Sequence, residues 1–462
     1  MTQKASTIEK MTPAELRAAG SLALIFFLRM MGLFLLLPVF TLQATSLRGA
    51  THTLVGVAIG CYGLSQAIFQ IPFGMLSDRF GRKKIITLGL IIFAIGSAVA
   101  AMSHSIYGVM LGRLLQGAGA ISSAVMALAA DLTREEQRTK TMAIIGISIG
   151  LSFSIAFILG PVVDHWAGLS GVFWAGTLMA AAAIAVLYLR VPNPARSGFH
   201  REVEAVPSQF GSVLRNPELL RLNAGIFCLH FILTASFYAI PLALRDVAGL
   251  PKAHHWYVYL PTLLLSILLI MPFLRRGDTQ GSARKRFLGA VGLLVIAQVA
   301  LIFGHNKLWE LYISMTLFFT AFNFLEANLP ALISRTAPAD RKGTALGVYS
   351  TCQFMGAFAG GITAGWLFGL YSYDGVFAAS IVLAVLWLLI ARGMREPESV
   401  VAAMMHVANP DPALAEVLQT KLRAMPGVRE AVVIAGEGTA YLKFNPKEAD
   451  REALQALCQS PA

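Results

Sequence analysis

Residues 74–84 read GMLSDRFGRKK, and this stretch places four cations and one carboxylate between two long apolar runs. Apolar residues make up 56% of the whole sequence and charged residues only 13%. This composition, with a mean hydropathy of +0.65, lies far outside the range of soluble domains. The sequence therefore predicts a membrane protein in which short charged segments, such as residues 74–84, connect apolar spans.

Apolar runs of about 20 residues recur along the chain, and this length suits helices that cross a hydrocarbon core of roughly 30 Å. Barrel strands would be shorter and would alternate in hydropathy. The predicted spans are 21–43, 54–76, 85–103, 106–130, 141–163, 172–190, 221–247, 255–275, 286–304, 308–335, 343–370 and 374–394. The first twenty residues are too polar for a cleavable signal, so the first span is expected to stay as an anchor. Thr12 to Glu15 has the form of a helix start, which predicts a short amphipathic helix before that span.

Lysine and arginine are distributed unevenly between the loops. With the N-terminus in the cytoplasm, 25 of the 37 cations fall in cytoplasmic segments and four in loops on the opposite side. Because cytoplasmic loops retain positive charge, we expect an even number of spans with both termini inside. The cations lie at membrane edges, without a basic stripe of interleaved aromatics, so the net charge of +12 indicates membrane lipid and no nucleic acid as the partner.

The chain divides into four parts. Residues 1–190 hold six spans, residues 191–220 form a linker rich in Pro, Gly and charge, and residues 221–396 hold six more. The halves echo each other after their fourth spans, with QRTKTMA at 137–143 and DRKGTAL at 340–346. Residues 400–462 read as β-α-β-β-α, the order of a small α+β ferredoxin-like domain with its last strand short or missing. The predicted fold class is thus an all-α polytopic membrane protein of two six-helix halves, with this domain appended.

The four cysteines, at 61, 228, 352 and 458, are scattered and show no metal or redox spacing. The loop after the first strand of the C-terminal domain, residues 409–412, also lacks a Cys pair, so neither a metal nor another cofactor is expected. No GxxxxGK[ST] motif and no cluster of nucleophile and base is found, which argues against a pump or an enzyme.

Residues 74–84 also contain a motif, Gly74-x-Leu76-x-Asp78-Arg79-x-Gly81-Arg82-Lys83. The matching motifs elsewhere are Arg113-x-x-Gln116-Gly117-x-Gly119-Ala120 in span four, Asp131 with Glu135 and Arg138 after it, and Gly160-Pro161 in span five. In these motifs residues 15–396 resemble the major facilitator superfamily of transporters. With its C-terminal domain the chain is similar to the YajR subfamily of bacterial inner-membrane transporters, usually grouped with drug:proton antiporters.

The resemblance implies that Asp78, Arg82 and Asp131 form a charge cluster that latches the first half to span eleven in the outward-open state. Gly74 and Gly81 allow close backbone approach and a tight turn. The alternative is that the cations of this loop only set topology, which is the role we expect for Arg79. A carboxylate is not needed for topology, so Asp78 and Arg82 favour the latch.

Ionisable groups inside the spans are the candidates for proton coupling, because each is costly there unless it is paired or lines water. Glu326 is the one acid well inside a span, and it is either the proton carrier or a structural hydrogen-bond partner of a neighbouring span. His230 in span seven is a second candidate, although a lone histidine in a span is more often a hydrogen-bonded packing residue. Arg113 matches the arginine that the family uses to tune a nearby acid. Arg29 is close enough to the cytoplasmic edge to snorkel there, which favours a structural role.

The expected function is proton-coupled efflux of small, apolar or amphipathic compounds by alternating access. One departure weakens antiport, because the antiporter signature GlyPro-x-x-GlyGly continues here from Gly160-Pro161 to Asp164-His165. A proton-coupled nutrient importer and a transporter-like sensor therefore stay open as alternatives. The C-terminal domain carries nearly balanced charge, so we expect it to dock on the basic cytoplasmic loops or on a second copy of itself.

Overall fold

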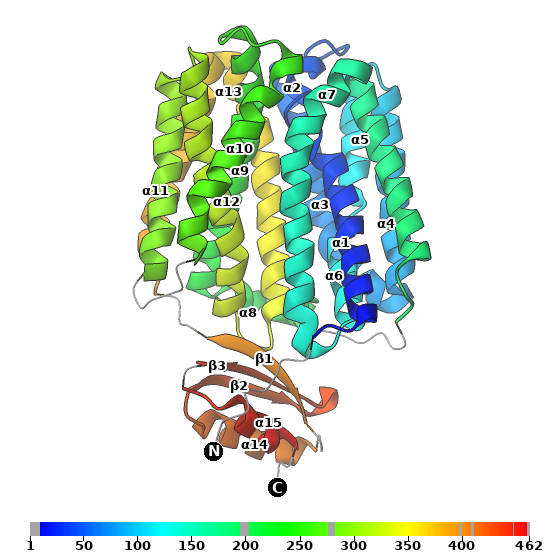
Figure 1. The fold of residues 1–462 in the computed structure, drawn as a ribbon, viewed down its shortest axis with the longest axis vertical. Coiled ribbons are helices and arrows are strands. Elements are labelled where there is room, and N and C mark those ends of the chain that lie inside the picture. The colour runs from blue at the N-terminus through cyan, green and yellow to red at the C-terminus, as the bar shows by residue number, and fades with distance from the viewer. Residues whose placement is uncertain are drawn as a thin grey trace.

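The structure, a computed structural model, describes residues 10–194, 203–275, 282–396, 400–407, 411–446 and 448–459. Long helices form a bundle, and a small sheet domain lies against one end of it (Figure 1). We call this end of the bundle the domain end and the opposite end the far end.

The first half of the chain is helical throughout its described part. Its helices are α1 (Pro13–Phe34), α2 (Phe40–Ala44), α3 (His52–Phe80), α4 (Arg82–Met102), α5 (Ile106–Ala118), α6 (Ser122–Asp131) and α7 (Glu135–Leu189). The second half consists of η1 (Pro207–Gln209), α8 (Phe210–Leu214), α9 (Pro217–Asp246), η2 (Lys252–His254), α10 (Trp256–Arg275), α11 (Ser282–Phe303), α12 (Leu308–Thr336) and α13 (Lys342–Arg392).

Ten helical segments in the described part are long and apolar enough to cross a membrane. Two of them, α7 with 55 residues and α13 with 51, are far too long for one crossing, since a helix of this length extends about 80 Å. Each contains one residue with left-handed backbone, Gly168 (φ 63°) in α7 and Ser372 (φ 56°) in α13, where the helix folds back. Figure 1 shows the bend of α7 at the far end. Each therefore contributes two crossings, so the bundle has twelve and the predicted fold class is confirmed.

The first helix starts at the predicted cap, but it is longer than predicted. The side chain of Thr12 accepts a hydrogen bond from the Glu15 N–H, and the Glu15 carboxylate accepts one from the Thr12 N–H. This capping box begins a helix that continues unbroken to Phe34. The separate amphipathic helix was therefore a wrong prediction, because the capped turn and the first span are one helix. Glu15 also accepts from Arg134 at 3.0 Å, which fastens the start of α1 to the start of α7.

The two halves meet where α3 crosses α13. A Cβ atom at Gly56 would overlap the carbonyl oxygen of Gly361, and a Cβ atom at Gly60 would lie 2.7 Å from the carbonyl oxygen of Phe358. Small residues let the backbones of membrane helices approach this closely, so dispersion contacts stabilise the crossing.

The C-terminal domain has the predicted order of elements: β1 (Val401–His406), α14 (Pro412–Ala424), β2 (Val428–Ile434), β3 (Thr439–Phe444) and α15 (Arg451–Gln459). The antiparallel sheet has the order β1-β3-β2, and Gly438 provides the left-handed residue (φ 59°) between β2 and β3. Leu418, Leu442 and Cys458 are fully buried in the core between sheet and helices. Burial raises the pKa of the Cys458 thiol to about 11, so this cysteine stays protonated at neutral pH.

Two side chains of the sheet bind the segment between α12 and α13. The ammonium group of Lys443, on β3, donates to the carbonyl oxygens of Arg335 (2.9 Å) and Ala337. Glu430, on β2, accepts from the Ala339 N–H at 3.2 Å and lies 3.5 Å from Lys443. The last carbonyls of a helix lack intrahelical partners and carry partial negative charge, so a cation at this position stabilises the end of α12.

Candidate functional site

Three polar side chains meet in the second half, one each from α9, α12 and α13. His230 Nε2 lies 3.1 Å from Glu326 Oε2. The amide nitrogen of Gln353 lies 2.7 Å from His230 Nε2 and 3.2 Å from Glu326 Oε1. The structure thus joins two residues that the sequence identified separately and adds Gln353, which it did not single out. Among the described residues no group of three His, Cys, Asp or Glu is placed to hold a metal ion.

The distances constrain the protons of this cluster. A neutral imidazole nitrogen without hydrogen and a carboxylate oxygen are both acceptors, so a 3.1 Å contact between them needs one proton. Nε2 has either one lone pair or one N–H, so it either accepts from Gln353 or shares a proton with Glu326, and Gln353 can donate to Glu326 Oε1 instead. The geometry therefore fits a cluster that holds one proton shared between Glu326 and His230.

The neighbours of Glu326 along α12 are engaged elsewhere. Asn323 donates to Ser266 Oγ on α10 at 3.1 Å, and Asn328 donates to the Phe324 carbonyl at 2.7 Å. The structure supplies the partners of Glu326 from α9 and α13 instead. The Glu326 side chain is still 36% exposed and that of His230 is 14% exposed, so a proton can reach the carboxyl group.

Aromatic rings connect this cluster to the first half. The ring of Phe322, one turn before Glu326, lies 6.0 Å from the His230 ring and stacks on Phe153 of α7 at 5.9 Å. Phe157, also on α7, contacts Phe237 of α9 at 4.7 Å. The polar cluster therefore borders an apolar contact between the two halves.

Arg29 is buried, with 2% of its surface exposed, and does not snorkel as expected. Its guanidinium donates to the carbonyl oxygens of Gln116 (3.1 Å) and Gly119 (3.3 Å) and lies 3.9 Å from the centre of the Phe93 ring. These carbonyls belong to the break between α5 and α6, where the helical hydrogen bonds stop. Arg29 therefore caps the carbonyls of this break, a contact that a structural role would require.

Arg113 is 3% exposed. It donates to Gln116 Oε1 at 2.8 Å, and its guanidinium carbon lies 4.9 Å from the centre of the Tyr62 ring. It borders a cavity of about 10 Å³ between the halves, room for a single water, with Thr234 and Phe237 of α9 on the other side. In the described part of the chain Arg113 forms no ion pair, so the acid that it was expected to tune is not beside it.

Residues 74–84 contribute to a cluster of four charged residues at the domain end. Arg82, 3% exposed, binds Asp78, Asp131 at 3.1 Å and Glu204 at 2.5 Å. Glu204 belongs to the linker, and the backbone N–H of Val206 donates to Thr344 on α13 at 2.9 Å. The structure thus brings Asp78, Arg82 and Asp131 together. This cluster is connected to α13 through the linker.

The remaining residues of this motif serve the turn. Gly81 has a φ of 96°, which favours glycine, and it separates α3 from α4. A Cβ atom at Gly74 would lie 3.0 Å from the Ser123 Cβ atom, so Gly74 lets α3 approach α6. Arg79 is exposed, and its guanidinium carbon lies 5.6 Å from the centre of the Phe80 ring, away from the buried cluster.

The span-five motif leads to a contact at the far end that the sequence did not predict. Gly160 packs closely against the Leu35 carbonyl, and Pro161 lies inside α7. One turn on, Asp164 has a side chain only 1% exposed and binds Lys252 of the second half at 3.2 Å. It also accepts from Gln43 at 2.8 Å. The acid that replaces the expected glycine therefore joins the two halves.

Comparisons with known proteins agree with this architecture. Residues 22–361 and 262–405 match the Major Facilitator Superfamily, and residues 405–460 match the YajR YAM domain. The chain is 46% identical to the Inner membrane transport protein YajR of Escherichia coli (strain K12), covering 98% of this chain and 99% of that protein. It is 25% identical to the Multidrug resistance protein MdtH of Klebsiella pneumoniae (strain 342), covering 73% and 83%. The crystal structure of the human organic anion transporter MFSD10 superposes with a TM-score of 0.62 at 21% identity, covering 82% and 100%, and shows the shared fold.

The twelve crossings in two halves, the charged loop motif and these matches define a multi-pass membrane transporter. The chain belongs to the major facilitator superfamily.

Proposed function

We propose that this protein is a proton-coupled transporter that exports small, apolar or amphipathic compounds by alternating access, with its domain end in the cytoplasm of a bacterium. The observation that carries the proposal is the contact of Glu326 with His230 and Gln353 across three helices. A titratable pair inside a membrane bundle, accessible to a proton and shared between helices, is what coupling of protonation to helix movement requires.

Protonation changes the contacts that this cluster can make. With one shared proton, Glu326 and His230 attract each other and α9, α12 and α13 stay together. When Glu326 is ionised, the imidazole N–H has to lie on Nε2 to face the carboxylate, so the Gln353 N–H can no longer donate to that nitrogen and the hydrogen bonds of the cluster rearrange. Protonation therefore biases the positions of these helices, and the aromatic contacts of Phe322 with α7 extend that bias to the interface between the halves.

Export is supported by the first-half motifs and by the printed function of the relative MdtH, a multidrug resistance protein. The absence of the antiporter glycine pair in span five argues against antiport, so the direction of transport needs its own test. Counterflow of labelled candidate compounds in proteoliposomes, with and without a pH gradient, separates the alternatives. An exporter accumulates substrate in inverted vesicles when their lumen is acidic, an importer responds to the opposite gradient, and a sensor shows no counterflow.

Alternating access needs contacts that close each end in turn. We infer that the Arg82 cluster, joined to α13 through the linker, secures the cytoplasmic end. The Asp164–Lys252 pair secures the opposite, periplasmic end, because it links α7 of the first half to η2 of the second. A buried carboxylate loses more than an exposed one when its cation is removed, so this pair has a measurable effect on the conformational equilibrium.

Asp164→Asn is expected to shift the protein toward the state open at the periplasmic end. The ion pair is half-buried, with Lys252 40% exposed, so the expected effect is about 1–2 kcal/mol, or roughly five- to thirtyfold in population. Spin labels at His104→Cys and Asn306→Cys, in a background without the native cysteines, measure the distance across that end. The swap Asp164→Lys with Lys252→Asp should restore the distance distribution in part, and an unchanged distribution in Asp164→Asn would refute the inference.

The C-terminal domain is expected to modulate transport through the segment between α12 and α13. Truncation after Glu398 should leave a protein that inserts and transports at a changed rate, because the helices of the bundle do not depend on the sheet. Lys443→Met removes the cation that caps α12 and should reproduce the changed rate. Arg451→Gln, an exposed cation of the same domain, is the control and should transport as the parent does. Failure of the truncated chain to insert would contradict this prediction.

A further inference from the structure

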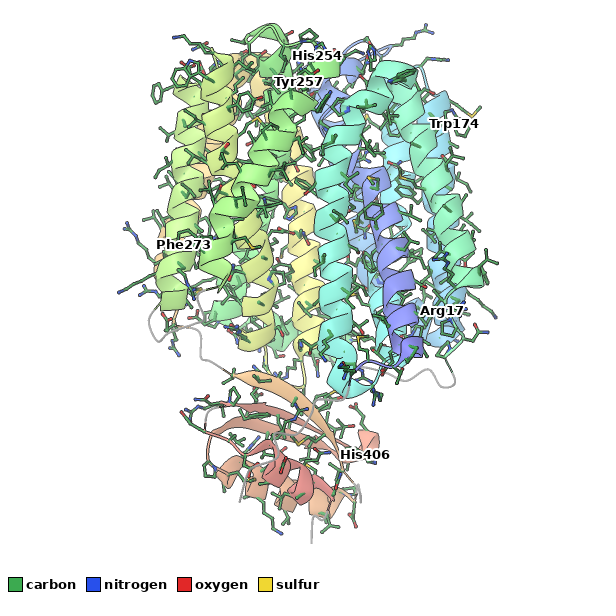
Figure 2. The ribbon with its side chains drawn as sticks, in the orientation of Figure 1. Arg17, Trp174, His254, Tyr257, Phe273 and His406 are labelled. Atoms are coloured by element: carbon green, nitrogen blue, oxygen red, sulfur yellow. The ribbon has the colours of Figure 1, made fainter. Side chains whose placement is uncertain are left out.

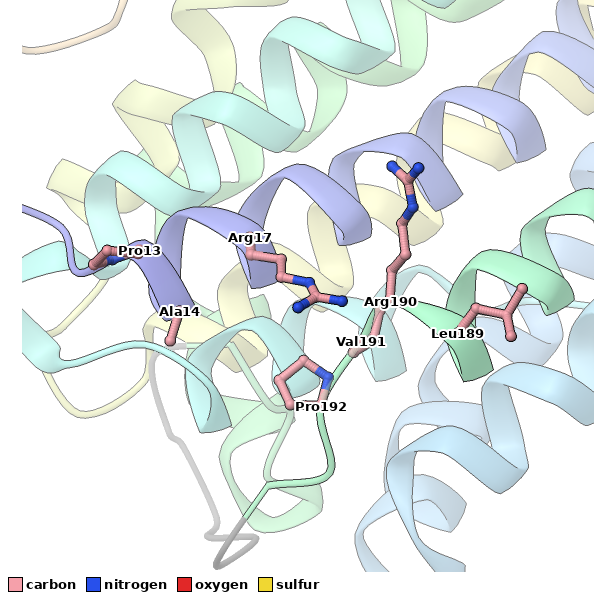
Figure 3. Close-up of a pocket in the computed structure, with 7 residues that line it drawn as sticks. All are labelled: Pro13, Ala14, Arg17, Leu189, Arg190, Val191 and Pro192. Carbon is pink, nitrogen blue, oxygen red and sulfur yellow. The ribbon is translucent and has the colours of Figure 1, made fainter.

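A cavity of about 410 Å³ lies between the start of α1 and the end of α7, outside the polar cluster and both end contacts. It is lined by Pro13, Ala14, Arg17, Leu189, Arg190, Val191 and Pro192. Figure 3 shows Arg17 projecting from α1 and Arg190 from the end of α7, at the rim of the same space. Its volume is within the range of small-molecule sites.

The residues that line this cavity carry positive charge and include no acid. Arg17 and Arg190 are both exposed, and in the described part of the chain neither side chain has a hydrogen-bond or ion-pair partner. Lys83 adds a third cation, since its ammonium group donates to the Val191 carbonyl at 2.6 Å. The nearby acid Glu15 is already bound to Arg134. Guanidinium groups without acidic partners favour a ligand with phosphate oxygens.

Exposed apolar side chains adjoin these cations. Leu189, in the cavity wall, is 77% exposed, Tyr188 beside it is 56% exposed, and Leu16 on α1 is 56% exposed. Figure 2 places Arg17 near the domain end of the bundle. A ligand that contacts both the cations and the exposed apolar side chains has an anionic headgroup and an apolar body. Such a ligand enters the cavity from the bilayer.

We propose that this cavity binds the headgroup of an anionic phospholipid of the cytoplasmic leaflet, with Arg17 and Arg190 on the phosphate and the acyl chains along the end of α7. Cations that only set topology require neither a cavity nor convergence of two helices. Basic pockets between membrane helices on the cytoplasmic side are suited to anionic headgroups. Occupancy would join α1 to the end of α7, the first and last spans of the first half.

Binding is measured by native mass spectrometry of the purified full-length protein. The probes are dioleoyl phosphatidylglycerol, dioleoyl phosphatidylcholine with the same acyl chains, and sn-glycerol 3-phosphate as the headgroup alone. The variants are Arg17→Gln, Arg190→Gln and the double variant. Arg215→Gln is the matched control, because Arg215 is an exposed arginine outside this cavity. Since Arg17 and Arg190 have no side-chain partners, their replacement should leave thermal unfolding unchanged.

We expect phosphatidylglycerol to bind more tightly than phosphatidylcholine, and its Kd to rise about fivefold for each arginine removed and about 25-fold for both. Arg215→Gln should leave the Kd unchanged. Equal binding of the two lipids, an equal loss in Arg215→Gln, or an unchanged Kd in the double variant would overturn the proposal. Binding of sn-glycerol 3-phosphate as tight as that of the lipid would show a soluble phosphate site and would overturn the assignment to lipid.

Discussion

Glu326→Gln is expected to abolish transport driven by a proton gradient, to the level of empty liposomes, while exchange of substrate without a gradient persists. Glutamine keeps the size of the side chain and its hydrogen bonds to His230 and Gln353, but it cannot release a proton. The three helices then stay in the arrangement that the proton stabilises. Folding should be preserved, because no charge is left without a partner.

The measurement is uptake and counterflow in proteoliposomes after an imposed pH jump. Glu310→Gln is the control on the same helix, since Glu310 lies in the first turn of α12 and, among the described residues, its carboxylate accepts a hydrogen bond only from the Lys307 N–H. It should transport as the parent does. His230→Asn keeps a polar side chain without the titration and should lose most of the pH dependence. A Glu326→Gln variant that still moves substrate against its gradient would rule out the coupling role.

Arg82→Ala is expected to destabilise the protein by about 3–5 kcal/mol and to slow turnover strongly. The guanidinium lies among Asp78, Asp131 and Glu204, and the side chains of the last two are 0% and 4% exposed. Removing the cation leaves these carboxylates buried without it. Arg82→Lys should recover only part of the loss, because an ammonium group lacks the planar fork that reaches several carboxylates.

Thermal unfolding in detergent and transport rate are measured together for these variants. Asp78→Asn should have a smaller effect than Arg82→Ala, and the double variant should be no worse than Arg82→Ala, because both act on one cluster. The spin-label pair at 104 and 306 should report a loss of the outward-open state. Lys84→Gln, an exposed cation of the same loop, is the control. Additive losses in the double variant would show that Asp78 and Arg82 act separately.

Hydropathy and charge predicted the membrane class, the twelve crossings and the order of elements in the C-terminal domain, because these depend on local patterns. The cap at Thr12 was predicted correctly, but the turn that it begins was assigned to a separate helix, since polarity alone cannot distinguish a capped first turn from a separate helix. The bends at Gly168 and Ser372 were also predictable from hydropathy, because at each position two apolar runs are joined by a short loop.

The partners of the site residues depend on tertiary packing, which local patterns do not contain. The depth of each residue was nevertheless readable. Glu326 lies ten residues before the end of α12, and Gln353 and His230 lie eleven and thirteen residues after the starts of α13 and α9. At 1.5 Å per residue these are depths of about 15–20 Å from the same end, so a count along the spans would have placed Gln353 and Glu326 at a similar depth. Glu204 offered no such signal, because a linker acid has no fixed depth.

The capping contacts of Arg29 have a consequence for the order in which the spans settle in the membrane during synthesis. Its acceptors, the carbonyls of Gln116 and Gly119, follow 87 and 90 residues later in the chain. At a translation rate of about 5–20 residues per second, the first helix waits roughly 4–18 s before these groups exist. During that interval we expect the nascent helix to keep its arginine at the aqueous interface. We therefore expect the first span to reach its final depth only after the fourth has been made, and an insertion assay on chains stalled before and after residue 119 should detect a movement of α1.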